Sequence, residues 1–317
     1  MKPLAEALNE YIGMRHALGF ELRHTARTLP QFVGFLDREG APFITTELAL
    51  RWAQENVGAS SVTRADRLGM VRRFAAWRSA VDPRTEIPPP GLLPRRYQRP
   101  TPYIYSEDEI KRIISCAASL KSAQGLRLRG PTCSTLFGLL AVSGMRVSEA
   151  VALDRADVDF QTGVLSIRRG KLGKSRFIPV HATTRDVLEN YAKQRDATLS
   201  GSVTPAFFVS DRRQRMTRFS AEDNFVKVSR AIGLRKHEEG HRFGHGPRLH
   251  DLRHRFAVAT LVQWYRSGAD VEREIPKLAT YLGHTHPDNT YWYLQAVPEL
   301  LQLATERCER MAKGGAQ

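Results

Sequence analysis

The residues with the clearest chemical potential lie near the carboxyl end, where the Gly283-His284 pair is followed nine residues later by Tyr293. A tyrosine phenol can attack phosphorus and form a phosphotyrosyl ester, while an imidazole handles the phenol proton or hydrogen-bonds a phosphate oxygen. Tyr291 lies close by and is a competing nucleophile. A capping histidine and a core tyrosine would give the same pattern, so the interpretation needs further parts of a phosphate site.

Two arginines could supply those parts. Arg146 follows a Ser-Gly pair that predicts the end of one helix, and Glu149 lies one turn further on, where it can orient the planar guanidinium toward phosphate. His250 and Arg253 are three residues apart at a predicted helix start, so we expect them to share a face and to suit a phosphate oxyanion. Each pair, taken alone, also fits an ordinary basic helix surface.

A lysine for the leaving group is predicted at a β-hairpin. The strand-like runs 164–168 and 176–180 flank a glycine-containing turn with Lys171 at the strand end and Lys174 as the alternative. A lysine there can protonate a leaving 5′ oxygen. A solvated basic hairpin tip is the competing interpretation.

Metal and cofactor sites are not expected. Carboxylates of the kind that hold Mg²⁺ do not cluster in the sequence, which favours a metal-free mechanism over a two-metal nuclease. The loop 235–247 has no matching cysteine or carboxylate set for its three imidazoles, His237, His241 and His245. The cysteines form no CxxC pair, so neither a zinc module nor a disulfide framework is indicated, and a reducing cytoplasm fits: Cys116, Cys133 and Cys308.

The charge of the chain points to a polyanionic partner. The 317 residues carry a formal net charge of +15, and the pI is about 10.1. Nucleic acid is the commonest partner of so basic a protein, and a generically basic surface is the alternative. No run approaches eighteen apolar residues, so a membrane span is not expected. The first six residues include an acid and no apolar segment, from which we expect no signal peptide.

The elements that position these residues divide into two predicted domains. Residues 1–85 show four short helical patterns, which predict a helical DNA-binding bundle with basic residues on its polar faces, at Arg15, Arg23, His24, Arg27, Arg64, Arg67, Arg72 and Arg73. Residues 86–103 are rich in proline and arginine, which favours an extended linker that can lie along phosphate.

Residues 104–317 form the predicted catalytic domain. Helices are expected after Ser106, which precedes three acids, and over 131–142, 184–196 and 221–232, with an additional strand at 206–209. A last helix over 298–311 can pack on its own domain or dock on a neighbouring protomer. The predicted fold class is therefore mainly α with a small antiparallel β-sheet.

These motifs, in this order, resemble the tyrosine recombinase (phage integrase) family, which includes the Xer recombinases and Cre. The resemblance covers nearly the whole chain and implies a SAM-like helical core-binding domain, a linker and an α+β catalytic domain. It favours Tyr293 as the nucleophile and implies Glu149 as a supporting acid and a catalytic set of Arg146, Lys171, His250, Arg253, His284 and Tyr293. The ending Tyr-Trp-Tyr-Leu looks like integrases of mobile elements.

The activity implied by the resemblance is site-specific recombination of double-stranded DNA, in the integration, excision or transposition of a mobile element. One strand is cut to a 3′-phosphotyrosyl link and a free 5′-hydroxyl, and the hydroxyl of a partner strand rejoins it without ATP, metal or cofactor. Family members act as DNA-bound tetramers, so a homo-tetramer or a mixed assembly with related recombinases is expected. The alternatives are a non-catalytic DNA-binding accessory factor of the same fold and a type IB topoisomerase-like enzyme.

Overall fold

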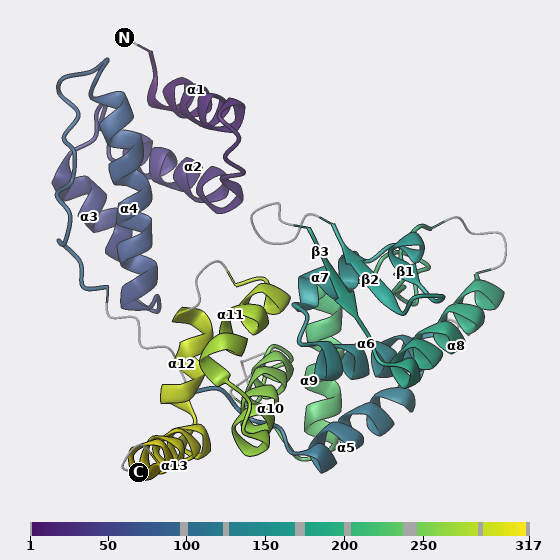
Figure 1. Cartoon of the computed structure of the whole chain (residues 1–317). Helices are drawn as coiled ribbons and strands as arrows, with labels where there is room; N and C mark the ends of the chain where they lie inside the picture. Colours follow the sequence, from purple (N-terminus) through teal and green to yellow (C-terminus); the bar gives the residue numbers. More distant parts are fainter. Residues whose placement is uncertain are drawn as a thin grey trace. The chain divides into compact units, whose positions relative to one another are not determined.

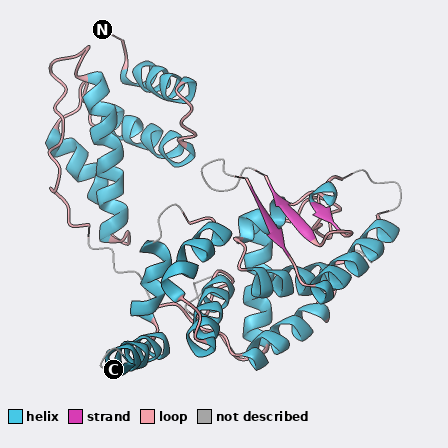
Figure 2. Cartoon of the chain, in the orientation of Figure 1, coloured by secondary structure: helices cyan, strands magenta, loops and turns pink. Residues whose placement is uncertain are grey.

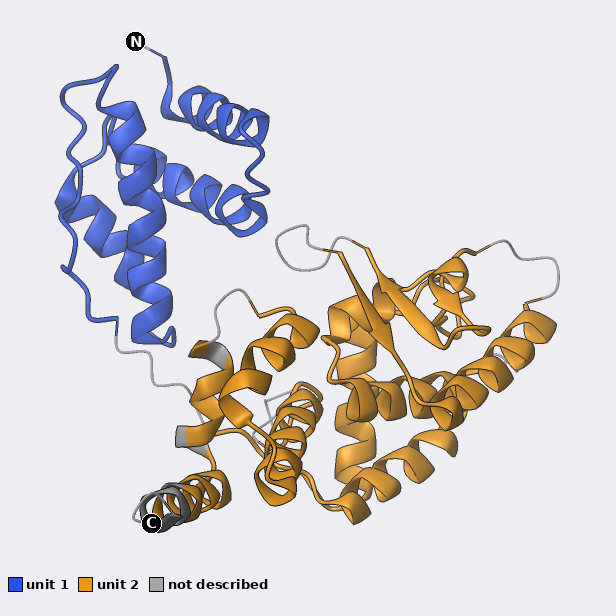
Figure 3. Cartoon of the chain, viewed as in Figure 1, with its two compact units in different colours: residues 1–100 blue, residues 101–317 orange. Residues whose placement is uncertain are grey.

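The chain folds into two compact units, residues 1–100 and 101–317 (Figure 3). The computed structural model describes residues 2–95, 101–122, 127–168, 175–199, 204–236, 246–284 and 288–314. Helices dominate both units, and the second also carries a small sheet (Figure 2). The division between the units falls inside the predicted linker 86–103.

The first unit is a bundle of four helices, α1 (Leu4–Ala17), α2 (Arg23–Arg38), α3 (Thr46–Gln54) and α4 (Ser61–Arg78). Thr45 and Ser60 accept hydrogen bonds from backbone N–H groups at the starts of α3 and α4, so each begins at a residue that caps it. Large apolar side chains from all four helices fill the core, among them Tyr11, Phe32, Trp52 and Phe74.

The first residues of the predicted linker pack against this bundle. Arg72 donates from Nε to the carbonyl of Pro88 at 2.6 Å and from Nη2 to that of Pro89 at 2.8 Å. The backbone N–H of Glu86 donates to Ile44 O at 2.9 Å. Proline carbonyls remain acceptors although proline has no N–H, which lets an arginine hold a proline-rich segment in place. Residues 96–100, with the linker arginines Arg96 and Arg99, lie outside the described residues.

The second unit contains the helices α5 (Glu107–Ala118), α6 (Arg129–Ser143), α7 (Val147–Ala152), α8 (Ala182–Thr198), α9 (Arg218–Ala231), α10 (Asp251–Ser267), α11 (Val271–Leu282), α12 (Asp288–Ala296) and α13 (Pro298–Gly314) (Figure 1). Ser106 and Glu109 form the capping box of α5. Ten of the fifteen residues of α6 are buried, so this helix runs through the core. None of the described helices is long and apolar enough to cross a membrane.

The sheet has three antiparallel strands in the order β1 (Val158–Asp159), β2 (Val164–Ile167) and β3 (Arg176–Pro179), with the short 3-10 helix η2 (Arg155–Asp157) before it. Leu165 pairs with Ile178, and both side chains are buried. The two strands of the predicted hairpin are therefore present and antiparallel, and the second begins at Arg176.

The predicted strand at 206–209 is wrong. Ala206 and Val209 make only isolated bridges, to Asp154 and Arg215 respectively. All four side chains of the segment are buried, Phe207 and Phe208 in the main core of the second unit and Ala206 and Val209 in a smaller apolar cluster. An apolar run predicts burial, but hydrogen bonding to a continuous partner strand decides whether it becomes a strand.

The last helix, α13, packs on its own domain. Leu300 is buried in an apolar cluster with side chains of α10 and α11, including Leu261 and Ile275. Of the two arrangements expected for the carboxyl-terminal segment, this structure has the one within a single chain.

Candidate active site

Gly144, directly after the last residue of α6, lies against Phe256 of α10 and Leu282 of α11. It ends α6 in the left-handed region with φ of 59°, and a Cβ atom there would lie 2.5 Å from Phe256 Cδ1 and 3.0 Å from Leu282 Cδ2. Its carbonyl accepts a hydrogen bond from Arg253 Nη1 at 2.7 Å. A residue without a side chain is therefore needed two positions before the first candidate arginine.

Replacing Gly144 with alanine is expected to lower the free energy of unfolding by about 2 to 4 kcal/mol, because left-handed strain adds to an overpacked contact with the Phe256 ring. The matched control is Gly268→Ala, which ends α10 at φ of 74° and has open space around the added Cβ. Chemical denaturation compares the two variants. Equal losses would show that the contact with Phe256 contributes nothing.

Arg146 is the N-cap residue, directly before the first residue of α7, and its guanidinium is held on two sides. Its Nη1 donates to Glu149 Oε1 at 2.8 Å, and its Nη2 donates to the Gly283 carbonyl at 2.8 Å. The other Glu149 oxygen accepts from the Arg146 backbone N–H at 2.9 Å. The glutamate thus orients the guanidinium, as the spacing predicts.

Arg176 is a member of this network that sequence reasoning did not identify. Its Nη1 and Nη2 donate to the two Glu149 oxygens at 3.0 and 2.8 Å, and its Nε donates to the Tyr281 carbonyl at 2.8 Å. One signal in the sequence could have pointed to Arg176. It is a charged residue at the start of an otherwise apolar strand, shortly after Lys171 and Lys174. Its partners are distant in sequence, so their identity could not be inferred.

The carboxyl-terminal end of α11 gathers three arginines. The consecutive carbonyls of Tyr281, Leu282 and Gly283 accept from Arg176, Arg253 and Arg146, respectively. These carbonyls form the negative end of the helix dipole and lack partners within the helix, so guanidinium groups satisfy and neutralise them. Because α11 holds all three, the guanidinium groups are fixed relative to one another in the absence of DNA.

The ionisation of Glu149 depends on its two arginines. Burial alone would raise the pKa of this carboxyl, but hydrogen bonds from Arg176 and Arg146 lower it from 4.5 to about 2. A carboxylate whose pKa falls on folding adds stability above its unfolded pKa, and this contribution disappears as the pH falls toward the folded pKa.

We therefore expect the Glu149→Gln variant to be less stable than the wild type by about 2 to 3 kcal/mol at pH 7. The difference should shrink as the pH is lowered from about 4.5 toward 2, because a protonated glutamate resembles glutamine. Thermal unfolding of both proteins across this pH range measures it. A difference that stays constant down to pH 3 contradicts a charged Glu149.

Arg253 lies in the first turn of α10 and is almost completely buried, at 3% exposure. Burial lowers the pKa of its guanidinium to about 10, and the charge of Arg146 acts in the same direction. The Tyr293 phenol raises this pKa, and its hydroxyl lies 2.8 Å from Nδ1 of His254, the residue after Arg253. Two arginines and the candidate nucleophile therefore share one region.

The two candidate histidines have different surroundings. The pKa of His250 is lowered to about 4, first by protein atoms that displace water and then by the charges of His254 and Arg253. Part of His250 remains exposed, so its neutral ring is accessible from solvent. His284 follows the Gly283 cap of α11, and its Nδ1 lies 2.8 Å from Thr290 Oγ1 of α12.

The two candidate tyrosines of α12 differ in burial. Tyr293 is fully buried, and its hydroxyl lies 2.8 Å from His254 Nδ1. Tyr291 is 41% exposed. The contact with His254 thus links Tyr293 to α10. This is a structural reason to favour Tyr293, in addition to its spacing in the sequence.

Related proteins show the family to which this chain belongs. The model of the phage integrase family matches residues 104–299. The y4rB protein of Sinorhizobium fredii, which carries the name of a candidate integrase/recombinase, is 48% identical over 312 residues, covering 98% of this chain and 98% of its own length. The chain belongs to the phage integrase family. Tyrosine recombinase XerA of Pyrococcus horikoshii is 32% identical over 208 residues, 66% of this chain and 62% of that protein.

Solved structures of the phage integrase fold confirm the predicted fold class. A lambda integrase tetramer bound to a Holliday junction superposes with a TM-score of 0.62 at 17% identity, covering 90% of this chain and 79% of that one. The Tn1549 transposon integrase in complex with transposon right end DNA gives a TM-score of 0.62 at 16% identity, covering 98% of this chain and 100% of that one. At these identities the likeness shows the fold alone.

Two of the predictions made from the sequence concern residues outside the described ranges. Lys171 and its alternative Lys174 fall in the segment between the described ranges that end at 168 and begin at 175. The imidazoles of the loop 235–247 are also outside the described residues, at His237, His241 and His245.

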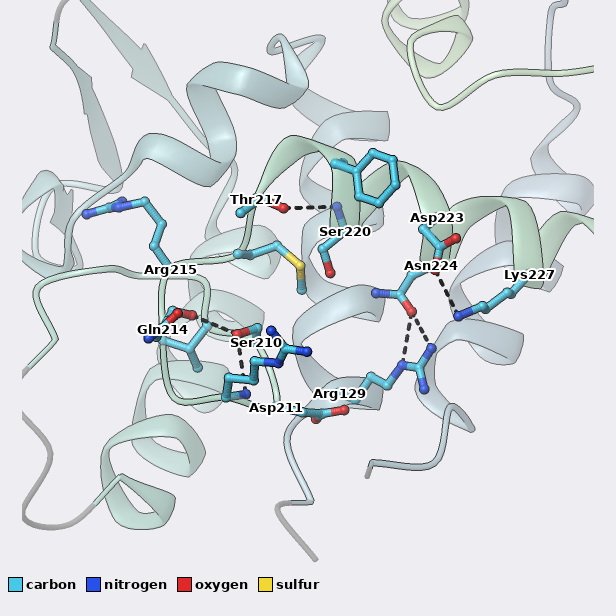
Figure 4. A pocket seen from close by; sticks show the side chains of 14 residues that line it. Arg129, Ser210, Asp211, Gln214, Arg215, Thr217, Ser220, Asp223, Asn224 and Lys227 are labelled. Atoms are coloured by element: carbon cyan, nitrogen blue, oxygen red, sulfur yellow. Dashed lines mark hydrogen bonds and ion pairs between the residues drawn. The ribbon is translucent and has the colours of Figure 1, made fainter. Parts of the chain in front are cut away.

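The second unit contains a cavity of about 430 Å³ (Figure 4). None of the residues that line it is one of the six candidate catalytic residues. Two of its lining cations contact other lining residues: Arg129 donates to Asn224 Oδ1, at 2.9 Å from Nε, and Lys227 lies 2.8 Å from Asp223.

Proposed function

We propose that this chain is a site-specific DNA recombinase that cuts and rejoins double-stranded DNA through a 3′-phosphotyrosyl intermediate, in the movement of a mobile element. The observation that carries the proposal is the arrangement at the end of α11. There Arg146 and Arg253 are fixed by consecutive carbonyls next to His284, and Tyr293 contacts the residue that follows Arg253, with its hydroxyl 2.8 Å from His254 Nδ1. Two fixed guanidinium groups beside a phenol suit phosphoryl transfer to tyrosine.

Each residue has a proposed role. Tyr293 attacks the phosphorus, while Arg146 and Arg253 stabilise the charge that develops on the non-bridging oxygens. Lys171 protonates the 5′ oxygen as it leaves, and the neutral His250 and His284 hydrogen-bond the phosphate.

The supporting residues act through these groups. Glu149 holds Arg146 and does not contact DNA. The energy of the phosphodiester is kept in the covalent link, which is why the rejoining step needs no ATP.

The proposed partner is double-stranded DNA, bound by both units in the cytoplasm. On the first unit, basic side chains of α2 and α4 are exposed, including Arg27 and Arg73. A lambda integrase tetramer bound to a Holliday junction is among the structures with this fold. We propose that this chain likewise assembles as a tetramer on DNA, alone or with related recombinases.

The proposal is tested by sequencing the DNA that becomes covalently attached to the full chain, and then using that site in a duplex nicked near the cut. Trapping of a denaturant-resistant adduct on the 3′ side, with a free 5′-hydroxyl, is the expected result. Exchange of strands between two such sites should follow.

The competing functions give different results. A non-catalytic accessory factor would bind DNA without an adduct. A topoisomerase-like enzyme would relax supercoiled DNA without exchanging strands between sites.

A further inference from the structure

His254 is a buried imidazole that contacts the phenol of Tyr293 and is not one of the six candidate catalytic residues. It lies in the first turn of α10 at 6% exposure. Its Nδ1 is 2.8 Å from the Tyr293 hydroxyl, and its Nε2 is 4.0 Å from Asp251 Oδ1. The imidazole therefore lies between a carboxylate and the atom proposed to attack phosphate.

The carboxylate of Asp251 is fixed in place. It is 2% exposed and accepts from the Arg248 backbone N–H at 2.7 Å and from Arg248 Nη2 at 3.1 Å. A fixed negative charge on the Nε2 side of His254 favours the tautomer that carries its proton on Nε2. That tautomer presents a lone pair from Nδ1 to the phenol.

The other neighbours also favour a neutral ring that accepts a hydrogen bond. The His250 ring meets His254 edge-on, with centroids 4.9 Å apart, and Trp292 lies 5.9 Å away. The cation of Arg253 is the preceding residue in the chain. A protonated imidazole beside this cation would be unfavourable, so His254 is best suited to hold the phenol as a neutral acceptor.

We propose that His254 is a further catalytic residue, which holds the Tyr293 phenol and takes its proton as the phenol attacks the DNA phosphate. The inference rests on the proposed function. As the tyrosine O–P bond forms, the phenolic proton moves to Nδ1. The bond from phosphorus to the 5′ oxygen breaks, and that oxygen takes a proton from the acid proposed at Lys171. In rejoining, the same proton returns from His254 to the departing phenol.

The variant that tests this role is His254→Asn. An asparagine amide can occupy the position of Nδ1 and keep a hydrogen bond to the phenol, but it cannot take a proton. The matched control is His181→Asn, an exposed histidine that caps α8 by accepting from the Thr183 N–H, a role that asparagine also performs. We expect His254→Asn to slow cleavage of the nicked duplex by about 10²- to 10³-fold and the control to cleave like the wild type.

A second substrate separates proton transfer from folding. DNA whose 3′ phosphate carries a p-nitrophenyl group can be joined to a 5′-hydroxyl without Tyr293, and its leaving group needs no proton. His254→Asn should join this DNA at the wild-type rate. An unchanged cleavage rate would overturn the proposal, as would an equal loss in both reactions. Failure of the proposed function is distinguishable, because the wild type itself would then form no adduct.

A measurement on the unaltered chain keeps the proposal testable should the variant fold poorly. Nitrogen NMR shifts of His254 in the wild type report which ring nitrogen carries the proton. We expect a protonated Nε2 and an accepting Nδ1 near pH 7. A neutral ring with the proton on Nδ1 would contradict the proposed role.

Discussion

Replacing Tyr293 with phenylalanine is expected to abolish the covalent protein–DNA adduct, with a loss of at least about 10³-fold, because the nucleophilic oxygen is removed. The ring itself should remain in place. It is fully buried and meets Trp292 at a centroid distance of 5.3 Å, contacts that phenylalanine can also make. Loss of the buried hydrogen bond to His254 should cost only about 1 kcal/mol.

Tyr291→Phe is the matched control for this experiment. Two residues along a helix turn the side chain to a different face, and Tyr291 is 41% exposed where Tyr293 is buried. We expect its adduct to form at the wild-type rate. Denaturing gels of the nicked duplex after incubation measure both variants, and DNA binding measured in parallel confirms that each is folded. An adduct that survives in Tyr293→Phe and is lost in Tyr291→Phe would reverse the assignment.

The local features of the fold could be predicted from the sequence because their causes are local. Ser60 caps α4, and Ser106 with Glu109 caps α5, through contacts within three residues. Gly283 ends α11 for the same kind of reason, since a left-handed residue is needed there. The pairing of Glu149 with Arg146 is also within one helical turn, and it was predicted.

The parts that could not be predicted depend on contacts between distant segments. Arg176 meets Glu149 across 27 residues of chain and Tyr281 across 105, and His254 meets Tyr293 across 39. The segment 206–209 was predicted to be a strand because its apolar run shows burial but not the partner of its backbone. Spacing in one sequence indicates which residue types are available, while packing decides which of them meet.

Removal of the Arg146 guanidinium is expected to slow cleavage by about 10³-fold, because charge that develops on the non-bridging oxygens loses a fixed donor. The contacts with Glu149 and Gly283 use one N–H of each terminal nitrogen, and a guanidinium has five N–H groups. Others are therefore available for phosphate. Single-turnover cleavage by Arg146→Ala, at saturating DNA, measures the loss.

The charge on the substrate provides the control. When a methyl group replaces one non-bridging oxygen of the scissile phosphate, the phosphorus group becomes uncharged. Its transition state then needs less stabilisation of negative charge. We expect the loss in Arg146→Ala to be much smaller on this DNA than on ordinary DNA. Losses of the same size on both substrates would mean that Arg146 shapes the site without stabilising charge on phosphate.

Arg176 should behave differently from Arg146 in this comparison. Its Nε, Nη1 and Nη2 all donate to protein groups, so it acts on the reaction by holding Glu149. Arg176→Gln should therefore slow cleavage of ordinary DNA by only about 10-fold, because a misplaced donor is worth roughly one hydrogen bond to a charged group, and this smaller loss should also shrink on the neutral substrate. A loss on ordinary DNA as large as that of Arg146→Ala would instead place Arg176 on the phosphate, beside Arg146 and Arg253.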